Sequence, residues 1–227
     1  MKSHLPASVS LTDESDETAL IALQGPNAEK ILSSLSDPQA VKTVKYYWAV
    51  DTKVCDVPCY LSRTGYTGED GFELYLPAKH AATIWDRLLE AGRKDGLIAA
   101  GLGARDTLRM EMGYPLHGHE LSPTISPLEA NLGWVVKLQK PVGFIGQEAL
   151  QKQAEAGPER TLRAFIVEDR RIARQGYRIN NSNQEPVGDI TSGTQSPHLN
   201  APIALGFVAK ANANDSKFFI GIREAQV

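Results

Sequence analysis

The hydrophobic pattern of the chain changes near residue 158, and this change limits the folds that the chain can adopt. Before that point, segments with apolar residues at helical spacing alternate with short segments rich in β-forming residues. After it come only short strand-like segments, separated by polar turns. We therefore expect an α+β protein. A mixed α/β domain with antiparallel strands and flanking helices is expected over residues 1–157, and a small antiparallel barrel or sandwich over residues 158–227.

The individual elements can be assigned from the same periodicities. Helices are expected at Asn27–Leu35, Ala78–Arg93, Leu102–Met112 and Gln147–Ala156. In the first domain, strands are expected at Thr18–Gln24, Val44–Val50, Cys59–Thr64, Phe72–Leu76 and Trp134–Leu138. In the second domain, strands are expected at Leu162–Val167, Pro186–Thr191, Ile203–Ala209 and Phe218–Arg223.

Composition excludes several classes of protein. The 24 Lys and Arg against 27 Asp and Glu give a net charge of −3, which provides no basic stripe for nucleic acid. No segment approaches the ~18–20 consecutive apolar residues that a membrane span needs, and the first residues do not resemble a secretory signal. Cys55 and Cys59 cannot form a disulfide framework and suit a reducing compartment. The sequence predicts an intracellular protein, in the cytoplasm or, in a eukaryote, the mitochondrial matrix.

A glycine-rich segment, Gly65–Gly71, lies between two expected strands. It matches neither the P-loop nor the dinucleotide-binding fingerprint, because it lacks the Lys-Ser/Thr ending and does not open a helix. We interpret it as a wide hairpin turn. Glu73 follows this turn on the strand face opposite Phe72 and Leu74. Its carboxylate is either simply solvated or an acceptor for a paired donor edge, such as the 2-amino and ring N–H groups of a pterin.

Arg105 and Arg109 lie four residues apart and share a face of an expected helix. Arg105 either forms a surface ion pair with Asp106 or Glu111, or binds a ligand carboxylate with its guanidinium group.

The segment His117-Gly118-His119-Glu120 has some character of a metal site. It supplies at most two histidine ligands, whereas zinc sites use three or four ligands, and the spacing of Cys55 and Cys59 does not provide the rest. We expect a polar turn there and no metal. A Ser–His–acid triad is not expected, because no Gly-x-Ser-x-Gly motif occurs.

Four stretches together point to one family. They are Leu23-Gln24-Gly25-Pro26, the run Arg63–Glu73 (RTGYTGEDGFE), the run Gly103–Arg109 (GARDTLR) and the run Ser126–Trp134 (SPLEANLGW). In this order they resemble the aminomethyltransferase (T-protein) family of the glycine cleavage system, and the resemblance extends from about Thr18 to Ala225.

The resemblance implies a fold of several domains around a central folate channel, ending in a β-barrel. It also implies tetrahydrofolate-dependent transfer of an aminomethyl group from the dihydrolipoyl arm of the carrier (H) protein, giving ammonia and 5,10-methylenetetrahydrofolate. Glu73 corresponds to the residue that grips the pterin, and Arg105 to one that contacts the folate. Tyr66 and Trp134 match further pocket positions, where aromatic walls suit a flat ring.

The chain departs from the family at both ends. Family members are longer at the N-terminus, where their catalytic aspartate lies, and they continue past the strand that contains Arg223. No catalytic residue is therefore assigned, and the chain alone is expected to be an inactive fragment. Two alternatives remain: a folate-binding accessory protein, whose Lys-Gly-Cys-Tyr-x-Gly-Gln-Glu marker this sequence lacks, and the folate domain of a dimethylglycine or sarcosine dehydrogenase.

Overall fold

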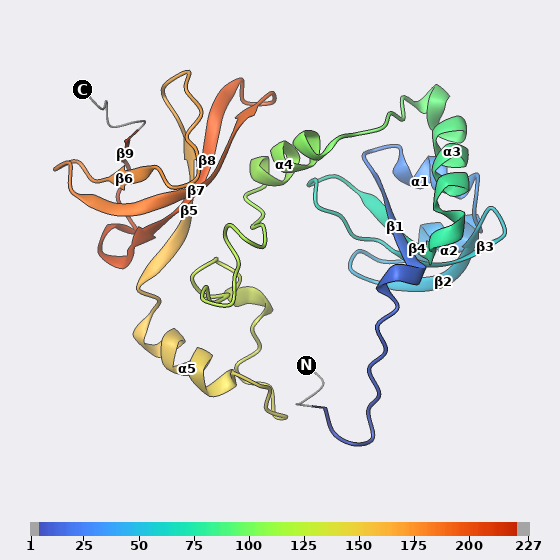
Figure 1. The fold of residues 1–227 in the computed structure, drawn as a ribbon, viewed down its shortest axis with the longest axis horizontal. Helices are drawn as coiled ribbons and strands as arrows, with labels where there is room; N and C mark the ends of the chain where they lie inside the picture. The colour runs from blue at the N-terminus through green and yellow to red at the C-terminus, as the bar shows by residue number, and fades with distance from the viewer. Residues whose placement is uncertain (1–4, 222–227) are drawn as a thin grey trace. The chain divides into compact units, whose positions relative to one another are not determined.

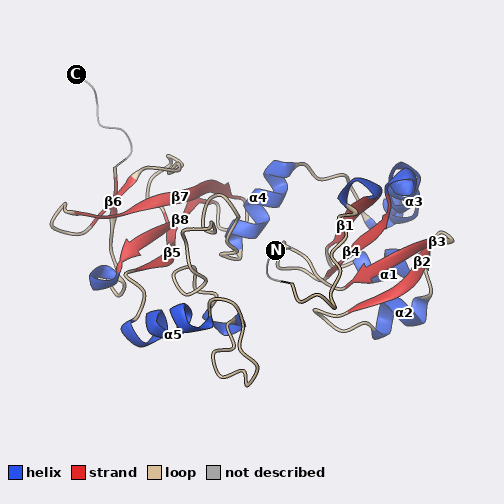
Figure 2. Cartoon of the chain, turned by 60° about the horizontal axis from the view of Figure 1, so that its bottom comes forward, coloured by secondary structure: helices blue, strands red, loops and turns tan. Residues whose placement is uncertain are grey.

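The computed structural model describes residues 5–221 and consists of two compact units, Met1–Gly101 and Leu102–Val227. Figures 1 and 2 show that each unit is built around its own sheet. The expected α+β class, with antiparallel sheets and flanking helices, is confirmed. The boundary that the sequence analysis expects between two domains, near residues 157–160, stays a prediction.

The first unit is a four-stranded antiparallel sheet covered on one face by helices. The strands lie in the order β1-β4-β3-β2. Their bounds are β1 Thr18–Gln24, β2 Ala49–Val54, β3 Val57–Ser62 and β4 Gly71–Pro77. The helices are α1 Ala28–Ser33, α2 Pro38–Thr43 and α3 Ala81–Gly92, with short 3-10 turns η2 Ser15–Glu17, η3 Ala78–His80 and η4 Arg93–Asp95.

The core of this unit follows from strict alternation in the strands. In β4, Phe72, Leu74 and Leu76 are buried against the helices, where they meet Leu32 of α1 and Ile84 of α3. The intervening side chains point to the other side of the sheet. That side, which we call the open face, carries two cross-strand rows of exposed or half-buried residues. The rows are Leu20, Tyr75 and Tyr60, and Ala22, Glu73 and Ser62.

The second unit is a five-stranded antiparallel sheet with helix α4 packed on it. The strands lie in the order β5-β8-β7-β6-β9. Met110 of α4 joins the apolar cluster formed by Leu162, Ile203, Leu205 and Phe207. The bounds are α4 Leu102–Glu111, η5 Gly133–Val135, α5 Gln147–Ala156, β5 Arg160–Ile166, β6 Arg178–Asn180, β7 Pro186–Ser196, β8 Ala201–Ala209, η6 Lys210–Asn212 and β9 Phe219–Ile220.

Two expected strands are wrong. The segment expected at Val44–Val50 begins as a turn, because Tyr47 adopts a positive φ of 64°, and β2 starts only at Ala49. The segment expected at Trp134–Leu138 forms the 3-10 turn η5, in which the N–H of Val136 donates to the carbonyl of Gly133 instead of to a neighbouring strand. Of the expected strand Phe218–Arg223, the last two residues lie outside the described residues.

Among the α-helices and strands, α2 and β6 were not predicted. Helix α2 begins at an Asp-Pro signal: the Asp37 carboxylate accepts a hydrogen bond from the Gln39 N–H at 2.9 Å, and Pro38 occupies the first turn. Strand β6 has only three residues, Arg178–Asn180, which is too short for alternation to reveal it.

Candidate functional site

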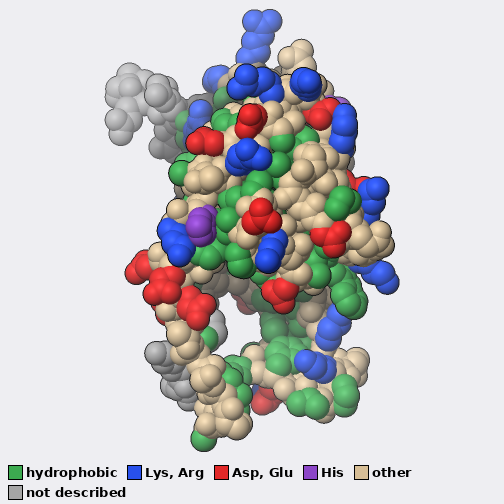
Figure 3. Space-filling model, turned by 90° about the vertical axis from the view of Figure 1, so that its right-hand side faces the viewer, with side chains coloured by type: hydrophobic (Ala, Val, Ile, Leu, Met, Phe, Trp, Pro, Cys, Tyr) green, Lys and Arg blue, Asp and Glu red, His purple; other side chains and the backbone are tan. Residues whose placement is uncertain are grey.

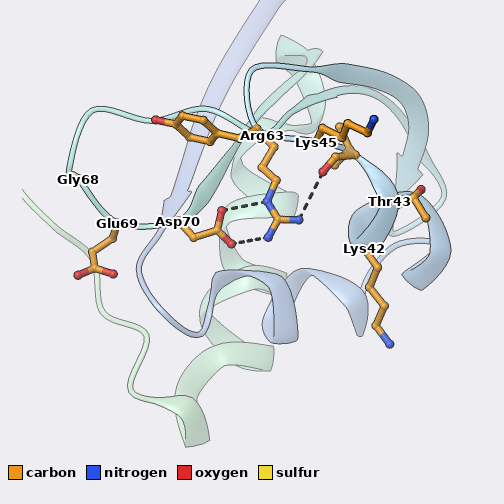
Figure 4. A pocket seen from close by; sticks show the side chains of 9 residues that line it. Lys42, Thr43, Lys45, Arg63, Gly68, Glu69 and Asp70 are labelled. Atoms are coloured by element: carbon orange, nitrogen blue, oxygen red, sulfur yellow. Dashed lines mark hydrogen bonds and ion pairs between the residues drawn. The ribbon is translucent and has the colours of Figure 1, made fainter.

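The glycine-rich turn that joins β3 to β4 is braced by Arg63. Its Nε donates to Oδ1 of Asp70 at 2.9 Å and its Nη2 to Oδ2 at 2.6 Å, and Nη2 also lies 2.8 Å from Oε2 of Glu29. Figure 4 shows the two-pronged contact with Asp70. Nη1 of Arg63 also donates to the carbonyl of Val44 at 3.4 Å. The hydrogen bonds from Arg63 hold the pKa of the Asp70 carboxyl below its usual value. The turn is therefore tied to both α1 and the segment before β2.

Gln24, at the end of β1, fills the space enclosed by this turn. Its amide nitrogen donates to the carbonyl of Thr64 at 3.1 Å and to the carbonyl of Phe72 at 3.3 Å. A Cβ atom added at Gly71 would lie 2.6 Å from the Gln24 amide, and one added at Gly65 would overlap it. The glutamine side chain therefore lies against the backbone of both glycines, and a side chain at either position would have to displace it. This accounts for Gln24 in the Gln-Gly-Pro motif and for Gly65 and Gly71 in the glycine-rich turn.

Glu73 lies on the open face, half-buried, beside the turn that Gln24 and Arg63 hold. Its Oε2 accepts a hydrogen bond from the Thr64 hydroxyl. The neighbouring row contains Tyr60 and Tyr75, whose rings meet edge to face with centroids 6.4 Å apart. Burial, together with the negative charge of Glu73, raises the pKa of Tyr75. The site thus combines an acceptor carboxylate with exposed aromatic side chains.

The four residues that the sequence suggested for ligand binding divide between the two units. Glu73 and Tyr66 belong to the first unit, where Tyr66 is half-buried in the glycine-rich turn. Arg105, exposed in the first turn of α4, and Trp134, 62% exposed in η5, belong to the second. Their roles in binding stay predictions.

Sequence reasoning missed a buried polar cluster in the second unit. Arg109 was expected on the same helix face as Arg105, yet it is only 1% exposed. Its Nη1 donates to Oε2 of Glu120 at 3.0 Å, its Nη2 to the Ser192 hydroxyl at 2.9 Å and its Nε to Asp106 at 2.8 Å. Glu120, fully buried, also accepts hydrogen bonds from the N–H of Leu116 and from the hydroxyls of Thr191 and Ser192. The cluster joins α4, the loop after it and β7.

The histidine pair His117 and His119 lies in a polar loop after α4. Nδ1 of His119 lies 2.9 Å from the carbonyl of Thr191, and Glu120 is engaged by Arg109. Within residues 5–221, His, Cys, Asp and Glu side chains form no group of three that could hold a metal ion. Both cysteines are free thiols, and burial raises the pKa of Cys59 to about 11. No helix in the described part of the chain combines the length and the apolar character needed to cross a membrane.

A hollow of about 540 Å³ opens beside the braced turn. It is lined by residues of α2, the segment after it and the turn, among them Lys42, Lys45 and Glu69 (Figure 4). Glu73 is not among its lining residues. In Figure 3, basic and acidic side chains are mixed over the face in view.

Comparison with known proteins identifies the class of protein. Residues 1–140 match the family model described as the GCVT N-terminal domain, and residues 160–227 match the glycine cleavage T-protein C-terminal barrel domain. The fold is similar to the crystal structure of the glycine cleavage system aminomethyltransferase T from Bartonella henselae. The TM-score is 0.79 and the sequence identity 31%, over 91% of this chain and 56% of that one. The C-terminal barrel expected from the resemblance is confirmed at the level of the domain family.

The curated relatives agree with this class. The aminomethyltransferase of Geobacillus thermodenitrificans is 49% identical over 92% of this chain, and that of Shouchella clausii is 48% identical over 94%. The chain belongs to the glycine cleavage T-protein family of aminomethyltransferases. It spans 57% and 58% of the length of these two relatives.

Proposed function

We propose that this chain provides the folate-binding part of a tetrahydrofolate-dependent aminomethyltransferase of the glycine cleavage system. The complete activity takes the aminomethyl group from the dihydrolipoyl arm of the carrier (H) protein, in the cytoplasm, and yields ammonia and 5,10-methylenetetrahydrofolate. The observation that carries this proposal is the half-buried Glu73 carboxylate, held on the open face next to Tyr75. Family membership supplies the class of reaction.

The residues present fit a reduced folate. An ionised carboxylate only accepts hydrogen bonds, and the 2-amino and ring N–H groups of a pterin form a paired donor edge. In the first unit, Glu73 binds that edge and Tyr66 supplies aromatic surface. For the second unit, the resemblance to the family implies that Arg105 contributes a guanidinium group for a folate carboxylate and Trp134 further aromatic surface. When bound, tetrahydrofolate supplies the amine nitrogen that receives the one-carbon unit. The role of these side chains is to bind and orient it.

Replacing Glu73 by glutamine should weaken the binding of tetrahydrofolate by about 10- to 100-fold, because hydrogen bonds to a charged group contribute about 1.5–3 kcal/mol. The side chain keeps its size, but one carboxylate oxygen becomes a donor that faces the donor edge of the pterin. Calorimetric titration of the purified chain measures the effect. The control is Glu69→Gln, which removes an exposed carboxylate from the same turn and should leave affinity unchanged. Wild-type affinity in the Glu73→Gln variant would contradict the proposal.

The 227-residue chain by itself should bind the folate and yet not complete the transfer. No aspartate of the chain matches the catalytic aspartate of the family, so the acid–base step lacks its group. The assay mixes the chain with tetrahydrofolate and aminomethyl-loaded carrier protein and measures ammonia release, with the Geobacillus thermodenitrificans relative as the positive control. Turnover by the chain comparable to that of the control would refute this expectation.

A further inference from the structure

Two hydroxyl groups, those of Thr64 and Ser62, are linked to the Glu73 carboxylate by successive hydrogen bonds. Ser62 is paired with Glu73 in the register of β3 and β4, and Thr64 follows two residues later along the chain. The Oγ of Ser62 lies 3.2 Å from the Oγ1 of Thr64, and the Thr64 hydroxyl donates to Oε2 of Glu73. Together, Ser62, Thr64 and Glu73 form what we call the hydroxyl chain.

The direction of each hydrogen bond in the hydroxyl chain is fixed by the number of protons. An ionised carboxylate can only accept, so the single hydroxyl proton of Thr64 points to Glu73. Because that proton is committed, the contact between the two hydroxyls requires Ser62 to donate to Thr64. Ser62 then has only lone pairs left. Within residues 5–221, no side chain or backbone N–H donates to Oε1 of Glu73. The Glu73 carboxylate and the Ser62 hydroxyl oxygen can therefore only accept further hydrogen bonds.

Thr64 is itself held in place from the opposite side. Its carbonyl accepts the hydrogen bond from the Gln24 amide at 3.1 Å, so the backbone at this residue is fixed by a side chain of β1. The branched Thr64 side chain has few rotamers, which limits where its hydroxyl can lie. Nothing in this arrangement contributes to the apolar core under the sheet, since Ser62 and Thr64 lie outside that cluster.

We infer that Thr64 is a positioning residue that fixes the Glu73 carboxylate, with Ser62 behind it, as an acceptor-only surface that selects the donor edge of the reduced pterin. This inference rests on the proposed function of the site. Sites built to hydrogen-bond an N–H group reject an analogue that lacks it, because buried acceptors are then left unpaired. The hydroxyl chain should therefore determine how strongly the site prefers tetrahydrofolate over an analogue that lacks the donor edge, and not only the affinity for tetrahydrofolate.

The test compares two ligands and three variants by calorimetry under reducing conditions. The ligands are tetrahydrofolate and an analogue that lacks both donors of this edge, the 2-amino group and the ring N–H. The variant Thr64→Val keeps the shape of the side chain but removes the hydroxyl. It should weaken tetrahydrofolate binding about tenfold and leave the analogue nearly unaffected, so that discrimination falls about tenfold. The variant Thr64→Ser keeps the hydroxyl and should retain discrimination within about threefold of wild type.

Ser62→Ala is a second, milder variant, which leaves the bond from Thr64 to Glu73 intact and should lower discrimination about threefold. It keeps the test decisive should Thr64→Val not fold. The inference is overturned if Thr64→Val folds and still discriminates between the two ligands as wild type does. If Thr64→Val does not fold, unchanged discrimination in Ser62→Ala overturns it. So does an equal loss for both ligands, which would show that Thr64 only supports the turn. If Glu73→Gln loses binding while Thr64→Val keeps wild-type discrimination, the proposed function stands and the inference fails. If the wild-type chain does not bind tetrahydrofolate, the proposed function and the inference both fail.

Discussion

Replacing Arg109 by methionine should lower the free energy of unfolding of the second unit by about 3–5 kcal/mol, the range found when one partner of a buried ion pair is removed. The guanidinium group is 1% exposed and is the cation that faces the fully buried Glu120 carboxylate. Without it, the carboxylate keeps its hydrogen bonds from Leu116, Thr191 and Ser192 but loses its opposite charge. Equilibrium denaturation in urea, followed by circular dichroism, measures the change.

The same experiment has an internal control and an external one. The double variant Arg109→Met with Glu120→Gln removes both charges, so it should recover a large part of the lost stability. Arg171→Met breaks the ion pair with Asp169, in which both side chains are well exposed, and should cost less than about 1 kcal/mol. A cost at Arg109 as small as that at Arg171 would contradict the structural role assigned to the cluster.

The fold was predictable where the signal is local. Strands β1 and β4 alternate apolar and polar residues, and a two-residue period fixes which side chains face the core, so the placement of Glu73 opposite Leu74 could be derived from the sequence. The segment Val44–Val50 misled because its residues favour strands, whereas the Trp48 N–H donates to the carbonyl of Lys45 and closes a turn there. The segment is also held by a hydrogen bond from the Tyr47 N–H to the carbonyl of Arg63. That bond joins residues 16 positions apart, which propensity does not record.

The candidate site was predictable only in part, because contacts between residues far apart in the sequence leave no local pattern. The conformation of the Arg63–Glu73 segment depends on Gln24, which lies 40 residues before Thr64 and was noticed only as part of a motif. The burial of Arg109 depends on Ser192, 83 residues further along the chain. A helix pattern shows that two arginines share a face, but it does not show which of them meets a strand from a distant part of the chain.

Replacing Gly65 by alanine should cost about 1–3 kcal/mol in the first unit. The added Cβ would occupy the place of the Gln24 amide, so that side chain must leave. The carbonyls of Thr64 and Phe72 would then lose the donor that joins the two ends of the turn. The matched control is Gly101→Ala, where an added Cβ meets no atom within 4 Å, and which should change stability by less than about 0.5 kcal/mol.

A double-mutant cycle isolates the cause of that cost. If the clash with Gln24 is responsible, Gly65→Ala should cost about 1–2 kcal/mol less in a Gln24→Ala background, because the side chain that it displaces is already absent. Urea denaturation of the four proteins gives the coupling energy. Equal costs in both backgrounds would mean that Gly65 is required for its backbone and not for Gln24. A positive coupling would instead show that the Gln24 side chain shapes the turn that presents Thr64 to Glu73.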